Sequence, residues 1–149
     1  MLLRSVGKVA GSTVAAVDAA AVADDLTIRR VLAEYCHCVD DGRFDDLVEL
    51  FSAAGEFWFG SFRPAGRDGV RAWFDEYQPP ELRGKHLTSN IAIRVDGDEA
   101  AATSDFVFLT YVDGALTPSI TGRYVDELER SADGWLIRRR EAVLLRPPR

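Results

Sequence analysis

The stretch that decides the fold is EYCHCVDDGRFDDL, residues 34–47. It has the pattern of the last turns of an amphipathic helix, a stop at Gly42, and a second helix that begins near Phe44. Asp40 is unusual in it, because a carboxylate in the last helical turn opposes the helix macrodipole. Asp40 therefore caps a neighbouring turn, or is exposed at the helix end, or has a partner elsewhere in the chain.

Upstream of this stretch, the spacing predicts a helix that Asp24 or Asp25 caps. Its apolar residues recur every three or four positions, as on one buried helical face: Ile28, Val31, Leu32, Tyr35 and Val39. Residues 1–24 form an N-terminal extension, with a short Ala-rich helix expected at about 14–23, and residues 25–149 form the domain. The extension is a poor match to a secretory signal, because glycine, serine and aspartate interrupt its apolar run.

Downstream, the pattern changes from helices to strands. It indicates helices at 44–52 and 67–77, with a short aromatic strand at 56–59 after an Ala-Ala-Gly turn. Long strands follow at 86–95, 99–111, 120–129 and 135–145, separated by turns that contain Asp-Gly. This order predicts an α+β fold in which a curved antiparallel sheet wraps around the N-terminal helices and encloses a pocket.

The composition limits the classes of function. The 149 residues carry 18 basic and 24 acidic side chains, a formal charge of −6, which argues against nucleic acid or an anionic membrane surface as partner. No apolar run approaches the roughly 20 residues that span a bilayer. Cys36 and Cys38 point to nearly opposite sides of a helix, so we expect two packing residues without a disulfide, in a cytoplasmic setting.

Several common catalytic motifs are missing from the sequence. It contains no phosphate-binding glycine loop, no nucleophile elbow and no cluster of metal ligands. We therefore expect no nucleotide cofactor, no serine-hydrolase chemistry and no zinc, and a protein that works without any cofactor. A lipid-like or aromatic ligand remains compatible with these absences.

Of the two histidines, one is a candidate base. His86 begins a predicted strand, where it is either a satisfied core histidine or half of a catalytic pair. Asp40 beside it would fix the imidazole tautomer and leave the second nitrogen free to carry a proton. His37 lies off the apolar stripe, so we expect it to be exposed. Tyr35 lies on the stripe, either as a core aromatic or as a hydrogen-bond donor to a substrate oxygen.

Several of these segments together resemble one known family. The chain is similar to SnoaL-like members of the NTF2-like superfamily, in the branch of scytalone dehydratase and the bile-acid dehydratase, and the resemblance implies their cone-shaped α+β fold. It covers about residues 25–145. It rests on Tyr35-x4-Asp40 with Phe44-Asp45, on KHLTSN at 85–90, on VDGD at 95–98, on GRY at 122–124 and on GWLI at 134–137.

The resemblance also implies a site. In the dehydratases, the positions of Asp40 and His86 form a carboxylate–imidazole pair that takes a proton next to a carbonyl and hands it to the departing hydroxyl. Tyr35 matches a tyrosine of the bile-acid enzyme. The pocket expected around these three residues is lined by Val39, Phe59, Phe62, Trp73, Phe106, Phe108, Thr110, Tyr124 and Arg140.

Three positions depart from the pattern of scytalone dehydratase. Val39 and Phe59 stand where that enzyme has two tyrosines that hold a water on the substrate carbonyl, and Thr110 replaces its second pocket histidine. The resemblance therefore implies a substrate other than scytalone. Its carbonyl would be polarised by Tyr35, Tyr124, Thr110 or an arginine of the last strand, Arg139 or Arg140.

Three functions are compatible with the sequence. The leading hypothesis is a cofactor-free lyase or isomerase on an apolar cyclic hydroxy-ketone, polyketide- or steroid-like, with His86 as base, Asp40 as its orienter and Tyr35 as a donor. The alternatives are a non-catalytic protein that binds a small hydrophobic molecule and the small structural subunit of a ring-hydroxylating oxygenase. We also expect a homodimer or homotrimer, because the convex face of the sheet has an apolar surface that includes Val107, Leu109 and Tyr111.

Overall fold

Helix α1 (Ala19–Asp41) ends at the predicted glycine. The computed structural model describes residues 18–146, and in it Gly42 has a left-handed backbone with φ of 70°. A Cβ atom at this position would meet only the flexible end of the Arg83 side chain, so it is the left-handed backbone that favours glycine. Helix α2 (Phe44–Glu49) begins directly afterwards. The predicted helix–glycine–helix pattern is confirmed.

The start of α1 lies further upstream than the sequence predicts. Its N-cap is Asp18, whose side chain accepts a hydrogen bond from the N–H of Ala20 (3.0 Å), so the predicted cap at Asp24 or Asp25 is wrong. Alanine is the best helix former, and the Ala-rich residues 19–23 simply extend the helix. The expected helical residues before Asp18 lie outside the described part of the chain. The division of the chain at residue 24 therefore stays a prediction.

Strand β1 (Phe51–Phe59) is longer than predicted. It pairs in parallel with β5, and the register shifts between Phe51 and Glu56, so Ala53-Ala54-Gly55 is a bulge within the strand and not a turn before it. Because Phe51 already pairs with Ile137 of β5, the second helix ends before the predicted residue 52. Helix α3 (Gly66–Tyr77) and the short 3₁₀ turn η1 (Pro80–Leu82) follow.

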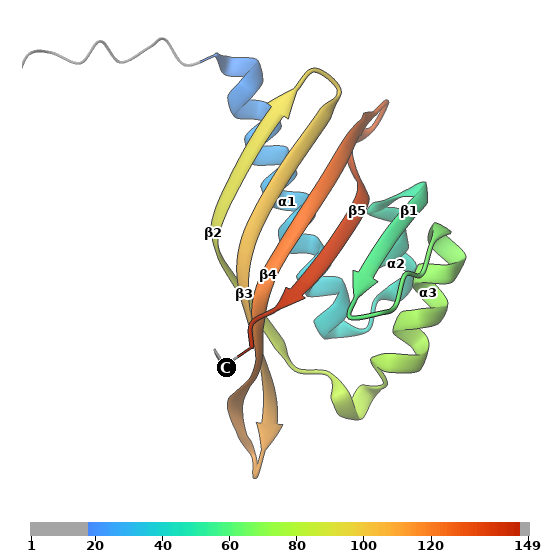
Figure 1. Ribbon diagram of the computed structural model, residues 1–149, viewed down its shortest axis with the longest axis vertical. Helices are drawn as coiled ribbons and strands as arrows, with labels where there is room; N and C mark the ends of the chain where they lie inside the picture. Colours follow the sequence, from blue (N-terminus) through green and yellow to red (C-terminus); the bar gives the residue numbers. More distant parts are fainter. Residues whose placement is uncertain (1–17, 147–149) are drawn as a thin grey trace, which may run out of the picture.

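Four long strands complete the sheet as the predicted antiparallel meander. They are β2 (Lys85–Asp96), β3 (Glu99–Val112), β4 (Ala115–Ser131) and β5 (Gly134–Leu144), and the order in the sheet is β1-β5-β4-β3-β2. Strand β4 starts earlier than the predicted residue 120, because β3 and β4 stay paired as far as Val112 and Ala115. Their ends form a hairpin arm that projects beyond the rest of the sheet (Figure 1).

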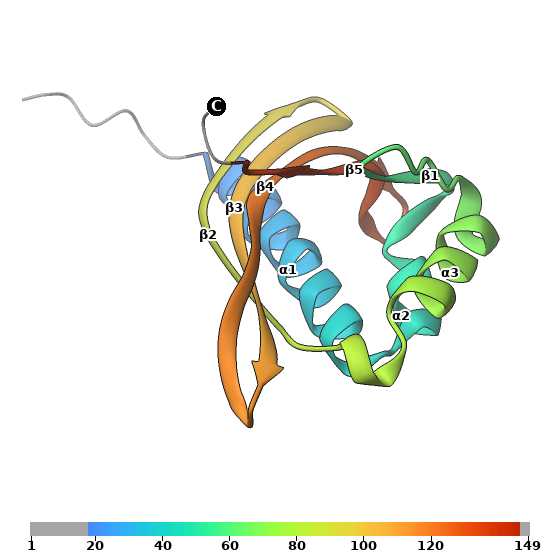
Figure 2. The same ribbon diagram turned by 60° about the horizontal axis from the view of Figure 1, so that its bottom comes forward.

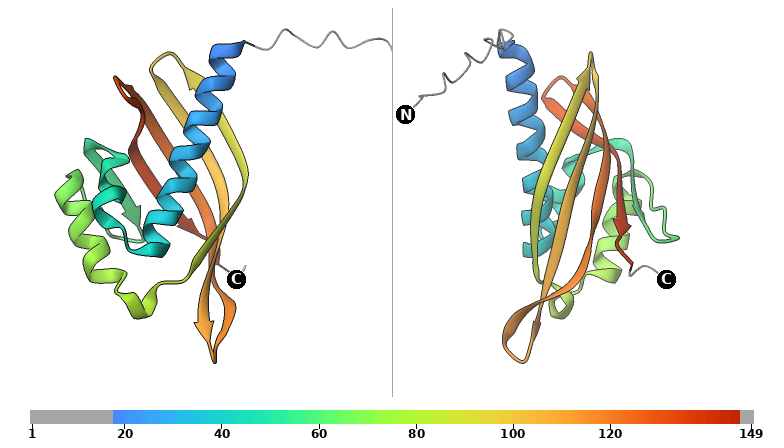
Figure 3. Two further views of the ribbon diagram at one scale, coloured as in Figure 1. Left: turned by 180° about the vertical axis from the view of Figure 1, so that it is seen from behind. Right: turned by 60° about the vertical axis from the view of Figure 1, so that its left-hand side comes forward.

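The sheet curls around α1, which lies across its concave face (Figures 2 and 3). Helix α1 packs against β2 and β5, and α3 packs against β1. Alternate strand residues point to this face and are buried there, among them Phe106 of β3 and Tyr124 and Leu128 of β4. The structure therefore confirms the predicted α+β cone.

The surface bears on two further expectations. On the outer side of β3, Val107 and Leu109 are half-buried, and Tyr111 in the arm is 68% exposed. Association of copies through the convex face stays a prediction.

None of the helices within residues 18–146 has both the length and the hydrophobicity that crossing a membrane requires.

Asp24 fastens the first turns of α1 to the hairpin between β4 and β5. Its carboxylate accepts hydrogen bonds from both terminal nitrogens of Arg130 (2.8 and 2.9 Å) and from Nε1 of Trp135 (3.0 Å). These bonds, that of Arg130 first, lower the pKa of Asp24 from its ordinary 3.8 to about 2. The ionised carboxylate is therefore bound in the folded state.

We predict that Asp24→Asn lowers the melting temperature at neutral pH, and that the difference from the wild type narrows in acid. A lowered pKa in the folded state stabilises the fold above about pH 4, and this contribution disappears as the pH falls through about 2. Thermal unfolding across this range is the measurement. Asp98→Asn is the control, because Asp98 also pairs with Arg130 but is 85% exposed. An unchanged difference at all pH values would contradict the assignment.

Candidate active site

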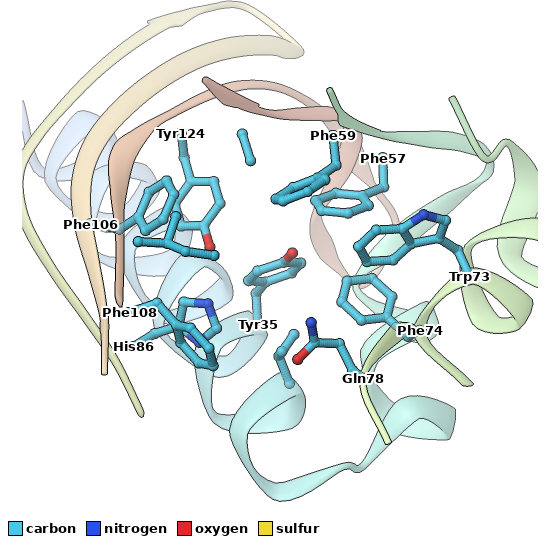
Figure 4. A pocket seen from close by; sticks show the side chains of 13 residues that line it. Tyr35, Phe57, Phe59, Trp73, Phe74, Gln78, His86, Phe106, Phe108 and Tyr124 are labelled. Carbon is cyan, nitrogen blue, oxygen red and sulfur yellow. The ribbon is translucent and has the colours of Figure 1, made fainter. Parts of the chain in front are cut away.

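A pocket lies between the C-terminal half of α1, α3 and the concave face of the sheet (Figure 4). Its volume is about 60 Å³. Its walls are mostly aromatic, and the residues that line it are Tyr35, Val39, Phe57, Phe59, Trp73, Phe74, Gln78, His86, Phe106, Phe108, Ile120, Tyr124 and Ala142. Two turns of α1, the C-terminal part of α3 and all five strands thus contribute residues to one small space.

Asp40 and His86 are hydrogen-bonded at one wall of this pocket. The distance between Oδ1 of Asp40 and Nδ1 of His86 is 2.6 Å, and the backbone N–H of His86 donates to both carboxylate oxygens (3.0 and 3.2 Å). The ammonium of Lys85 lies 3.5 Å from Oδ2. The side chain of Asp40 is 1% exposed. A partner from β2 therefore explains why a carboxylate stands at the end of α1.

The hydrogen bond assigns the tautomer of His86. An ionised carboxylate only accepts hydrogen bonds, so Nδ1 of His86 must carry the proton toward Asp40. The other ring nitrogen, Nε2, is then an acceptor, and the imidazole is among the residues that line the cavity. The ring lies against Phe108, with 4.5 Å between centroids, because the two residues are direct partners in the β2–β3 register. The Asp40–His86 pair thus presents one acceptor nitrogen, Nε2 of His86, to an aromatic environment.

A second buried pair lies beneath the pocket. Asp126 and Arg140 are register partners on β4 and β5, and Nε and Nη2 of the guanidinium donate to the two carboxylate oxygens (2.7 and 2.8 Å). Neither side chain is exposed. Burial alone would lower the pKa of Arg140, but Asp126, with Tyr35 and Cys36, holds that pKa above its ordinary value. Arg140 is therefore a permanent cation inside the fold.

The cation of Arg140 lies between two pocket tyrosines. Its Cζ is 4.1 Å from the ring centre of Tyr35 and 4.2 Å from that of Tyr124. Burial raises the pKa of both phenols well above the ordinary value of 10.0, although the charge of Arg140 opposes this shift. Both hydroxyls consequently stay protonated at neutral pH. They belong to the pocket lining (Figure 4), where they are potential hydrogen-bond donors.

Most of the side chains predicted for the site meet here. Tyr35 and His86 line the pocket, together with six of the predicted wall residues: Val39, Phe59, Trp73, Phe106, Phe108 and Tyr124. Asp40 lies behind His86 and does not line the cavity itself. The two cysteines are free and buried, and His37 is exposed, with 60% of its side chain accessible.

Three residues predicted to line the pocket lie elsewhere, and so does Arg139, which was a candidate for polarising the carbonyl. Phe62 is 42% exposed and packs outside on Tyr77. Thr110 is further along β3, opposite Thr117 in the arm. Arg140 is below the tyrosine rings, and not on the pocket surface. Arg139 points away from the core, where it pairs with Glu127 and lies over Trp58. The arginine that can influence the tyrosines is therefore Arg140 and not Arg139.

Sequence reasoning missed two polar groups of the site. Asp126 could have been found from strand parity, because the inward positions of β4 run Gly122, Tyr124, Asp126, Leu128 and place a charge among core residues. Gln78 had no such signal, because it follows the last residue of α3 and precedes two prolines. Among residues 18–146, no three His, Cys, Asp or Glu side chains are grouped so that they could hold a metal ion.

Comparison with known proteins identifies the family of this chain. A model of the SnoaL-like domain matches residues 20–141. The chain belongs to this family. A relative, the uncharacterized protein Rv2910c of Mycobacterium tuberculosis, is 29% identical over 129 residues, which cover 81% of this chain and 85% of the relative. The predicted resemblance to SnoaL-like proteins is confirmed.

Solved structures of the same fold agree. An NTF2-like protein with a cystatin-like fold from Novosphingobium aromaticivorans superposes with a TM-score of 0.81 at 26% identity, covering 87% of this chain and 86% of that one. A second protein from the same organism, provisionally named a scytalone dehydratase, gives a TM-score of 0.75 at 22% identity, with 85% and 87% covered. The latter likeness shows the fold alone.

We predict that Asp40→Asn in this SnoaL-like protein changes the tautomer of His86. In the wild type, the proton should be on Nδ1 by about tenfold or more, since a hydrogen bond to a charged group contributes about 1.5–3 kcal/mol. An asparagine can instead donate its amide proton to Nδ1, which moves the imidazole proton to Nε2. The ¹⁵N shifts of the imidazole at alkaline pH report this change. Asp41→Asn is the control; an Nε2–H imidazole in the wild type would contradict the assignment.

We predict that Asp126→Asn destabilises the domain by about 3–5 kcal/mol, because it leaves the buried cation of Arg140 without its counter-ion. Urea unfolding followed by circular dichroism measures the loss. The matched control is Glu127→Gln on the same strand, which weakens the partly exposed pairs with Arg138 and Arg139 and should cost less than about 1 kcal/mol. Equal losses of unfolding free energy in the two variants would contradict a larger contribution from the buried pair.

Proposed function

We propose that this SnoaL-like protein is a cofactor-free lyase or isomerase that acts on an apolar cyclic hydroxy-ketone. One observation carries the proposal: the 2.6 Å hydrogen bond between Asp40 and His86, with the imidazole at the wall of a mainly aromatic pocket. A histidine held in this way is suited to accept a proton and return it.

The proposed reaction starts at the carbon next to the substrate carbonyl. Nε2 of His86 removes a proton from this carbon, the electron pair moves toward the carbonyl oxygen, and an enolate forms. Asp40 stabilises the imidazolium, which bears protons on both nitrogens. In a lyase, the enolate reforms the carbonyl and expels a hydroxyl from the next carbon, while the imidazolium gives its Nε2 proton to the leaving oxygen as water departs. In an isomerase, the same proton returns to another carbon.

The negative oxygen of the enolate needs donors that keep their protons. Tyr35 and Tyr124 fit this role, since burial raises the pKa of both hydroxyls. The cation of Arg140 lies within about 4 Å of both rings, where it favours negative charge shared between the enolate and the phenols. Thr110 lies outside the pocket lining, so we omit it from the carbonyl site. Donors already in position stabilise the intermediate more than the neutral ketone.

The comparisons support the reaction class and do not select a substrate. The protein provisionally named a scytalone dehydratase has the same fold as this chain. Its name supports only the class of reaction, the elimination of water. Fold by itself does not decide function. A cytoplasmic location and an oligomeric state stay predictions beside this proposal.

A non-catalytic ligand-binding protein is the second candidate. Val39 and Phe59 line the pocket. By the resemblance, scytalone dehydratase has its two water-holding tyrosines at these positions, so the walls of this pocket are more apolar than those of that enzyme. An oxygenase subunit is a weaker candidate, because a structural subunit has no use for an inward imidazole held by a carboxylate. The next experiment separates binding from catalysis.

We predict that His86→Ala lowers kcat on the best substrate of a panel of cyclic β-hydroxy-ketones by about 10²–10⁴-fold, the usual contribution of one acid–base residue. Circular dichroism verifies that the variant is folded. His37→Ala is the matched control, because the other histidine is exposed and its loss should leave kcat within about twofold. Wild-type kcat in His86→Ala would refute the proposal. Binding of several ketones without any turnover would favour the second candidate.

A further inference from the structure

Two pocket residues with polar atoms are not used by the proposed reaction: Trp73, whose buried Nε1 lacks a partner among residues 18–146, and Gln78. Gln78 can both donate and accept hydrogen bonds. It caps the C-terminus of α3, its backbone N–H donates to the carbonyl of Phe74 (2.9 Å), and its own carbonyl accepts from Nε of Arg83 (3.2 Å). The backbone N–H and carbonyl of Gln78 are thus both hydrogen-bonded. Its side chain lines the pocket from the α3 side (Figure 4).

The amide of Gln78 is not satisfied by the described part of the protein. Its Oε1 is buried and has no hydrogen-bond partner among residues 18–146. A buried acceptor without a partner is unfavourable, and most such groups in native proteins are paired. The surrounding wall is apolar, so a leucine or methionine would suit this position better if packing alone mattered. An unpaired amide oxygen on a residue that lines a pocket can accept a hydrogen bond from a polar group of a ligand.

The volume of the pocket limits the size of that ligand. A cavity of about 60 Å³ corresponds to roughly four water-sized spheres, and a cavity of about 150 Å³ is known to hold benzene. One ring can enter when side chains at the wall change rotamer, as they commonly do on binding. A molecule of four fused rings would have to displace the aromatic walls. The expected polyketide- or steroid-like size is therefore larger than this pocket favours.

We propose that the pocket takes a single-ring molecule with two oxygen functions, one at His86 and a hydroxyl at Gln78. The His86 end rests on the proposed function, whereas the Gln78 end rests on its own unpaired amide. A hydroxyl both donates and accepts, so it can satisfy either end of the amide. Gln78 is then a positioning residue: it fixes the ring so that one carbon faces Nε2 of His86.

Binding of phenol and of the three dihydroxybenzenes tests the proposal. These rings carry one or two hydroxyls, and the best of catechol, resorcinol and hydroquinone reports how far apart the two ends lie. We predict that this isomer binds the wild type roughly three- to tenfold tighter than phenol, the size of one net hydrogen bond. In Gln78→Leu, the ratio of the two dissociation constants should fall to about one. Isothermal titration or NMR titration gives the ratio.

Two further variants keep the test decisive. Gln78→Met has nearly the length of glutamine without its polar atoms, so it replaces Gln78→Leu should that variant fail to fold. Glu76→Leu, at an exposed position of the same helix, should keep the wild-type ratio. A ratio that persists in Gln78→Leu or Gln78→Met would overturn the proposal. So would a wild type that binds no dihydroxybenzene more than twofold tighter than phenol, or that binds a four-ring steroid ketone tighter than any single ring.

The outcomes also separate this proposal from the proposed function. Loss of the ratio in Gln78→Leu together with unchanged kcat in His86→Ala would support two-point binding and refute the acid–base role. A persistent ratio in Gln78→Leu together with the loss of kcat in His86→Ala would do the opposite. The first readout is a ratio of affinities and the second is a rate, so neither substitutes for the other.

Discussion

The contact on which the site depends is the junction of Asp40 at the end of α1 with His86 at the start of β2. It joins segments 46 residues apart and satisfies a carboxylate that is almost fully buried. The ionised side chain costs free energy on burial, and the helix macrodipole opposes it by about 0.3–1 kcal/mol. Three hydrogen bonds from His86 and the nearby ammonium of Lys85 offset this. Stability alone would favour an apolar residue at this position, which fits the proposed role of Asp40 as the residue that orients the imidazole.

The two buried acidic residues, Asp40 and Asp126, bind different partners. Asp40 holds the imidazole that the proposed reaction uses first as base and then as acid. Asp126 holds a guanidinium that does not lose its proton. The rings of Tyr35 and Tyr124 lie against this guanidinium, and burial raises the pKa of both hydroxyls. In the proposed reaction, the mobile proton, the fixed charge and the two hydrogen-bond donors would thus occupy separate places.

The sequence was informative where the residues themselves restrict the backbone or the environment. Gly42 identifies the end of α1, Asp-Gly turns identify the hairpins, and an apolar stripe interrupted by Asp40 indicates a partner. It was uninformative where tertiary pairing decides. The first residues of β1 form a strand only because Phe51 pairs with Ile137, and Asp126 is buried only because of the parity of β4. Gln78 follows a helix end in a segment without periodicity, so only the folded chain shows that its amide enters the pocket.

The positions of the polar groups connect binding with the choice of reaction. An imidazolium can return its proton to a departing hydroxyl or to a carbon, and the atom that lies closest to Nε2 decides between the two. A ring held only by apolar walls could rotate and expose several atoms to the base. A hydrogen bond from the ring to Gln78 would remove this freedom, so that binding energy at a distant oxygen is used to orient the reacting carbon. The amide at the end of α3 would then determine the product, although it takes no part in the proton transfer itself.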